Sequence, residues 1–147
     1  MKRYVYLCFV FLFATASCHK REDIDPRDRY LGTYYGNYNS FTVSSQVIMI
    51  AYKDTIKVTK SAKNEYGLTI AVRKYTLEAS LQADNTFKME PLERYVSITI
   101  DGKPTQKQIY TGEGSIAGDS ITIKMKSSYI VAPEEFKDFV TITGGKK

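Results

Sequence analysis

The chain has 147 residues, about the length of a single domain. It holds two cysteines, one histidine and no tryptophan, and its formal net charge is +5. These counts argue against zinc sites, disulfide frameworks and Cys–His or Ser–His catalysis. Twelve tyrosines and seven phenylalanines favour strands, in which aromatic residues are enriched.

The N-terminus has the order of a secretory signal peptide. Met1-Lys2-Arg3 is basic, and the next 13 residues, up to Ala16, carry no charge. This run is too short for a helix that crosses about 30 Å of hydrocarbon, which needs about 20 residues. Small residues follow the apolar run, as they do before a cleavage site. We therefore predict a signal helix within residues 1–17.

Two processing routes fit this segment. Ala14-Thr15-Ala16 matches the small-x-small pattern of ordinary signal peptidase. The segment 15–18 instead resembles the lipobox of bacterial lipoproteins, in which the cysteine is acylated and becomes the first residue. Cys8 is removed by either route, so Cys18 would otherwise be a lone thiol in an oxidising compartment. This favours a lipoprotein with palmitate on Cys18, held in the bacterial cell envelope, with the outer membrane as the expected location.

Residues 18–28 form a polar, charged stretch that we interpret as a tether between the membrane and the domain. His19 lies in this tether, beside the anchor, and is a poor candidate for a ligand or a base. Cleavage removes Lys2 and Arg3, which lowers the basic count from 21 to 19 against 16 acids, a net charge of +3. This charge does not call for a nucleic-acid partner.

Residues 29–147 show a period of two that is typical of strands. Tyr30, Tyr34 and Tyr38 fall on one face with Gly32 and Gly36 between them. We expect these tyrosines to line a cavity or to fill a core. Gly32 is expected to leave room for a neighbouring ring.

Turn signals separate the alternating segments, and no window of 12 residues shows a convincing helical period. The turns are expected at Asn64 to Gly67, Asp84-Asn85, Asp101-Gly102 and Gly118-Asp119. Pro91 predicts that its strand ends or lies at an edge. An all-β sandwich or barrel follows. The short links favour a meander, and about 115 residues suit an eight-stranded antiparallel up-and-down barrel.

Two segments carry a resemblance to a known family. Gly32-Thr33-Tyr34 resembles the Gly-x-Trp signature of lipocalins, with tyrosine in place of tryptophan. The Tyr30–Tyr34 opening, and residues 112–119 leading into an Ile-Thr-Ile strand, resemble lipocalin-like or calycin-like small lipoproteins of the Bacteroidota. The resemblance covers residues 29–147. It implies an eight-stranded up-and-down barrel that often has an interior cavity, and it assigns no reaction and no catalytic residue.

Catalytic chemistry is not predicted. No cysteine or histidine follows His19, and Ser115 beside Gly112 and Gly114 does not have the spacing of a nucleophile elbow. The acidic pairs are interpreted as solvated loop charge, which leaves no predicted metal ligands and no cofactor. The acidic pairs considered are Glu90 with Glu93 and Glu134 with Glu135.

Two functional hypotheses remain. The first is a non-enzymatic, lipid-anchored barrel that binds a small apolar or amphipathic ligand in its mouth. The alternative is an envelope protein-interaction module, such as an inhibitor or an accessory subunit of a surface complex, with a filled barrel.

Overall fold

The computed structural model describes residues 24–44, 47–73, 75–96, 106–131 and 134–147. The predicted signal peptide, Cys18, His19 and the Asp101-Gly102 turn lie outside the described residues. A 3-10 turn, η1, precedes nine strands. The elements are η1 (Asp28–Tyr30), β1 (Gly32–Val43), β2 (Val47–Lys60), β3 (Gly67–Val72), β4 (Tyr75–Leu81), β5 (Thr86–Met89), β6 (Leu92–Val96), β7 (Gln106–Ala117), β8 (Ser120–Val131) and β9 (Glu134–Lys146).

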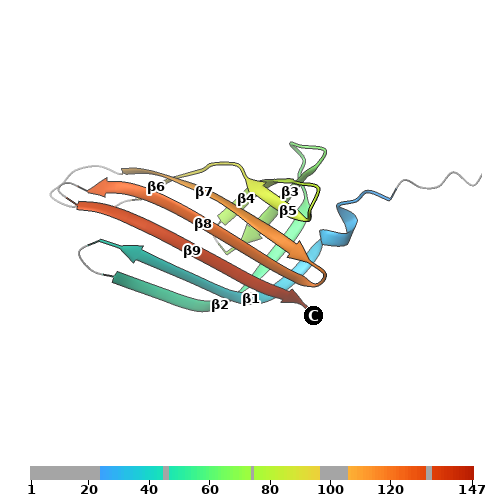
Figure 1. Cartoon of the computed structure of the whole chain (residues 1–147), viewed down its shortest axis with the longest axis horizontal. Coiled ribbons are helices and arrows are strands. Elements are labelled where there is room, and N and C mark those ends of the chain that lie inside the picture. The colour runs from blue at the N-terminus through green and yellow to red at the C-terminus, as the bar shows by residue number, and fades with distance from the viewer. Residues whose placement is uncertain (1–23, 45–46, 74, 97–105, 132–133) are drawn as a thin grey trace, which may run out of the picture.

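The strands form a closed, eight-stranded, antiparallel up-and-down barrel (Figure 1). Apart from β5 and β6, neighbours in the chain pair with one another, and β1 closes the ring by pairing with β9. Both β5 and β6 pair with β7, along different stretches of it, so together they take one strand position. Pro91 lies between them and cannot donate a ladder hydrogen bond. The all-β prediction and the barrel prediction are confirmed, and the sandwich is excluded.

Buried side chains fill the end of the barrel beside η1. Tyr34 is fully buried, and its hydroxyl donates to the Tyr30 carbonyl oxygen at 2.8 Å. Tyr30 is also buried and donates to Asn85 Oδ1 at 2.6 Å. We call this the closed end. Large side chains that fill it include Tyr34, Ile56, Leu68, Ile70, Phe87, Ile121, Ile123 and Ile142.

Glycines at two crossings let the strands approach closely. Gly36 lies opposite Gly144, and a Cβ on Gly36 would overlap the backbone of β9. Gly114 lies opposite Phe87, whose ring occupies the space of the missing side chain. Bare backbone at these points therefore allows β1 to pack against β9 and Phe87 to fill the core.

Gly32 has a different role from the one expected. Its φ is +137°, a conformation that L side chains rarely adopt, and the residue is exposed. An added Cβ would meet only the flexible end of Lys146, at 3.4 Å. The expectation that Gly32 makes room for a ring was wrong. The backbone conformation is what requires glycine here.

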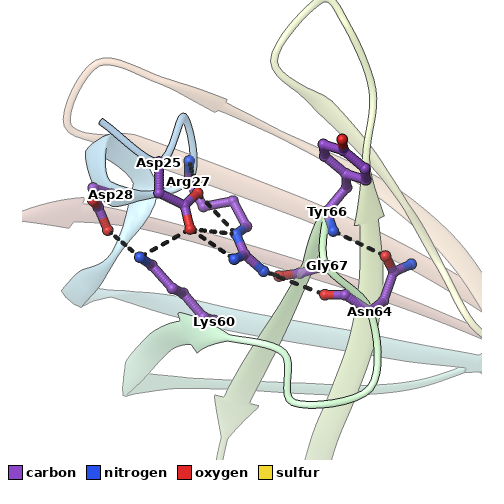
Figure 2. Close-up of polar contacts among 7 residues, drawn as sticks. All are labelled: Asp25, Arg27, Asp28, Lys60, Asn64, Tyr66 and Gly67. Atoms are coloured by element: carbon purple, nitrogen blue, oxygen red, sulfur yellow. Dashed lines mark hydrogen bonds and ion pairs between the residues drawn. The ribbon is translucent and has the colours of Figure 1, made fainter. Parts of the chain in front are cut away.

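The segment before η1 is clasped against the turn between β2 and β3 (Figure 2). Asp25 pairs with Arg27 at 2.6 Å and with Lys60 at 2.9 Å. Hydrogen bonds from Arg27, and then from Lys60, hold the pKa of Asp25 well below its usual value of 3.8. The last residues of the predicted tether, from Asp25 onward, are therefore bound to the barrel. Arg27 also donates to two carbonyl oxygens of the turn, those of Asn64 and Gly67.

Beyond the β3–β4 hairpin the barrel is open on one side. β1, β2, β7, β8 and β9 have 12 to 14 residues, whereas β3 and β4 have 6 and 7. Of the 14 residues of β2, only Ile56–Lys60 pair with β3. In the described part of the chain, no strand pairs with Val47–Thr55 on the side away from β1. We call this side of Val47–Thr55 the free edge, and the curved sheet β2-β1-β9-β8-β7-β6 at this end the open trough (Figure 1).

Substitutions in β1 test which of its faces packs in the closed end. Tyr34→Ala should cost about 3–5 kcal/mol of unfolding free energy, because it empties a fully buried site. Gly32→Val should cost about 1–3 kcal/mol through backbone strain. Thr33→Ala, on the opposite face, should cost less than about 1 kcal/mol. Urea unfolding measures all three. A Thr33→Ala loss as large as that of Tyr34→Ala would show that the inward face is misassigned.

Candidate functional site

The open trough collects polar and aromatic side chains from six strands on one concave face. Cross-strand register places Tyr38 opposite Tyr52, Thr42 opposite Asp138 and Phe136 opposite Tyr129. Residues directly opposite one another in antiparallel strands project to the same face of the sheet. Residues of this face are Tyr38 and Thr42 of β1, Ile48, Ile50, Tyr52 and Asp54 of β2, Arg94 of β6, Gln108 and Tyr110 of β7, Ser127 and Tyr129 of β8, and Phe136 and Asp138 of β9.

Four tyrosines separate the trough from the closed end. Tyr38 stacks on Tyr52 with ring centroids 4.6 Å apart, and on Tyr75 at 6.3 Å. Tyr75 meets Tyr110 edge to face at 6.1 Å. A hydrogen bond of 3.4 Å also joins the hydroxyls of Tyr38 and Tyr75. We call these four residues the tyrosine ladder, and they form the floor of the trough.

A buried carboxylate ties three strands together above this floor. Asp138 accepts hydrogen bonds from Thr42 Oγ1 at 2.6 Å and from Tyr110 Oη at 3.0 Å. Gln108 Nε2 donates to the same carboxylate. A buried charge is tolerated only when it is well hydrogen-bonded, and these three donors meet that need from β1 and β7.

Two inward-facing polar atoms lack a partner, and one of them lies beside this network. Ser127, opposite Asp138, is buried, and its Oγ has no hydrogen-bond partner among the described residues. Asp54 Oδ2 is likewise a buried atom without a partner in that part of the chain. Unpaired buried polar atoms are costly, so a site that leaves two of them in one trough is suited to a bound water or ligand.

Two arginines lie over the tyrosine ladder. The Arg73 guanidinium is 4.1 Å from the ring centroid of Tyr52, and that of Arg94 is 4.6 Å from Tyr75. Within the described ranges, neither arginine has a carboxylate within 4.0 Å. Their charges therefore remain available to an anionic group of a ligand.

The outer part of the trough is apolar. Ile48 and Ile50 project to the concave face and are 55% and 52% exposed. Tyr129 and Phe136 stack at 5.1 Å at the same end. The trough thus has an apolar entrance and a polar, aromatic floor, which is the distribution that an amphipathic molecule requires.

The predicted tyrosines divide between two places. Tyr38 belongs to the tyrosine ladder, whereas Tyr30 and Tyr34 pack in the closed end and do not face the trough. The sequence interpretation missed Asp138, Gln108 and Arg94. Asp138 carried a usable signal, since it shares the inward face of β9 with Val140 and Ile142.

A second hollow lies outside the barrel. A groove of about 940 Å³ runs over the outward faces of β1, β5, β7, β8 and β9. Phe41 and Phe139 lie at one end of it, with ring centroids 5.3 Å apart. The remainder includes several lysines and threonines, with Glu113 opposite both Lys88 and Lys124; the lysines and threonines are Lys88, Lys124, Lys126, Thr86, Thr111, Thr122 and Thr141.

Comparisons with known proteins leave the site to be interpreted from its chemistry. No family model, no curated protein and no solved structure gave a significant match to this chain. In the described ranges, histidine, cysteine, aspartate and glutamate form no group of three that can hold a metal ion. The same ranges contain no helix that is long and apolar enough to cross a membrane.

The buried tyrosines predict a loss of stability in alkali. Burial first, and then the hydrogen bond with Tyr75, raises the pKa of Tyr38 above its usual 10.0. Burial and the charge of Asp138 raise the pKa of Tyr110. The unfolded chain releases these protons near pH 10, while the folded chain keeps them. Their contribution is therefore complete below about pH 10 and is lost as the pH rises further.

Urea unfolding between about pH 9 and pH 11 tests this expectation. Tyr110→Phe should lose less unfolding free energy over this range than the wild type. Its unfolding free energy at the lower pH should already be smaller, because Asp138 loses a hydrogen-bond donor. Tyr66, which is 63% exposed, supplies the control, and Tyr66→Phe should keep the wild-type loss. Equal losses in all three proteins would contradict the assigned burial of Tyr110.

Proposed function

We propose that this protein is a non-enzymatic, lipid-anchored envelope protein that binds a small amphipathic ligand in the open trough. The observation that carries the proposal is the exposure of Ile48 and Ile50 on a concave face whose floor is polar. Exposed apolar side chains on a concave surface are typical of binding sites. The unpaired Ser127 Oγ adds support, because a ligand or its water would satisfy it.

The trough suggests how such a ligand lies. Its apolar part packs against Ile48 and Ile50, because burying such side chains is worth about 1.5–3 kcal/mol each. Its head lies near Arg73 and Arg94, where an anionic group gains two charge-assisted contacts. The ligand class is therefore an amphipathic molecule with an acidic head.

The lipid anchor attaches at the opposite end of the barrel. Asp25 binds beside the β2–β3 turn, near the closed end, and lies seven residues after Cys18. Seven extended residues span at most about 25 Å. Acylation of Cys18 therefore keeps the closed end close to the membrane and leaves the trough unobstructed by the anchor.

The alternative function, an envelope protein-interaction module, has one observation of its own. The outer groove combines the Phe41–Phe139 pair with several lysines, a composition that suits a partner with apolar and acidic groups. Mass spectrometry of the protein purified from its own membrane under native conditions distinguishes the two. A retained small molecule supports the ligand proposal, and a retained polypeptide supports the module.

A fluorescent amphipathic anion, 1-anilinonaphthalene-8-sulfonate, tests the trough directly. The wild type should bind the probe, and Ile50→Asp should bind it about ten- to hundredfold more weakly, because an apolar contact is replaced by a negative charge. Arg73→Gln with Arg94→Gln should weaken binding as well. Fluorescence titration measures all of these affinities.

Ile130 provides the matched control for the titration. It is an isoleucine of similar exposure, 62%, on the outward face of β8. Ile130→Asp should bind the probe as the wild type does. Equal weakening by Ile50→Asp and Ile130→Asp would place the probe on exposed apolar surface in general, and the trough would lose its assignment.

The lipid anchor has a separate test. Cells that express the full chain should incorporate a fatty-acid label into the protein, because Cys18 is the cysteine that remains after cleavage. Cys18→Ala should abolish the label, whereas Ser17→Ala should retain it. Labelling of Cys18→Ala at the wild-type level would refute acylation at this residue.

A further inference from the structure

The free edge of β2 exposes both its backbone and its side chains. Val47, Ile48, Met49 and Ile50 are four consecutive apolar residues, and Met49 is 80% exposed. Residues 47–52 include no charge. Soluble proteins normally protect such an edge with lysine, proline, a bulge or a covering segment. Residues 47–52 carry neither a lysine nor a proline, and no strand in the described ranges pairs with this side of them, so within those ranges the edge is open to pairing.

The edge has a defined end. Asp54 Oδ1 accepts a hydrogen bond from the Thr55 backbone amide at 2.7 Å, next to the point where β3 begins to pair. Lys53 and Asp54 are the first charges along the strand. The stretch that can accept another strand is therefore Val47–Tyr52.

This stretch is complementary to itself. An antiparallel pairing with a two-fold axis at Met49 sets Ile48 of one copy against Ile50 of the other, and Val47 against Ala51. Within Val47–Ala51 every pair is apolar, and inward residues meet inward residues. A pairing centred at Ile50 would instead set Lys53 against Val47. Side-chain chemistry thus selects both the partner and the register.

The outward face supports the same register. Met49 lies opposite Phe41, and Phe41 lies opposite Phe139. Pairing two copies at Met49 would join these residues into a continuous outward row of six apolar side chains across two sheets. Such a row buries more apolar surface than the backbone pairing does alone.

We propose that the protein forms a two-fold symmetric dimer in which the free edges of two β2 strands pair antiparallel about Met49. The two closed ends then point in opposite directions, so a dimer with both anchors in one bilayer lies along the membrane surface. Anchoring two copies in one membrane also raises their effective concentration for this pairing.

Cysteine cross-linking in cells that express the full chain tests the register. Met49→Cys places two thiols opposite one another on the axis, and directly opposed Cβ atoms lie about 4.5–5.5 Å apart, near the reach of a disulfide. A mild oxidant should convert Met49→Cys to a covalent dimer. Ile130→Cys, outward on β8 and away from the free edge, should yield about tenfold less. Equal yields would overturn the proposal. The absence of a covalent Met49→Cys dimer would also overturn it, and would indicate that the strand contacts lipid or another protein instead.

Charge exchange tests whether the partner is a second copy. Met49→Lys and Met49→Glu should each be monomeric in detergent, because like charges would meet on the axis, and a mixture of the two should recover the dimer. Sedimentation measures the mass of each sample. A wild-type monomer, or a mixture that stays monomeric, would overturn the proposal. Probe binding retained by monomeric Met49→Lys would show that the ligand function stands apart from the dimer.

Discussion

The unequal lengths of neighbouring strands are the constraint on which the rest of this structure depends. A β-barrel closes only where each strand finds a partner on both sides, and β3 offers β2 only five residues of pairing. The ring is therefore complete beside η1 and incomplete beyond the β3–β4 hairpin. The concave trough, the free edge and the exposure of Ile48 and Ile50 all follow from this mismatch.

Side-chain hydrogen bonds stabilise the open trough, where β3 and β4 do not continue the ring. Asp138 joins β9 to β1 and β7 across the concave face, and so helps to hold the curvature of the sheet. Its negative charge would also affect the recognition that we propose. An acidic ligand head would be repelled from Asp138 and attracted to Arg73 and Arg94, which lie over the tyrosine ladder. In that proposal, Asp138 and the two arginines together define where the head binds.

Sequence patterns predicted the barrel because the alternation of apolar and polar residues within a single strand is enough to distinguish its inward face from its outward face. Alternation placed Tyr34 and Tyr38 on one face, which is the inward face of β1, and the short links indicated the meander. The tyrosine ladder was not predictable in this way, because Tyr75 meets Tyr38 and Tyr110 only through the register of distant strands. Gly32 shows another limit, since alternation indicates a face but not a positive φ.

The two proposed roles of β2, ligand binding and dimerisation, use the side chains and the backbone of the same residues. The two roles therefore depend on one another. In the first proposal the inward side chains of Ile48 and Ile50 contact the ligand, and in the second the backbone edge pairs with a second copy. In the proposed register, Ile50 of the partner lies next to Ile48 and extends the apolar lining of each trough. A ligand that contacts this extended lining binds the dimer more tightly than the monomer. Linkage then requires the ligand to strengthen dimerisation by the same factor, which ties occupancy of the trough to assembly at the membrane.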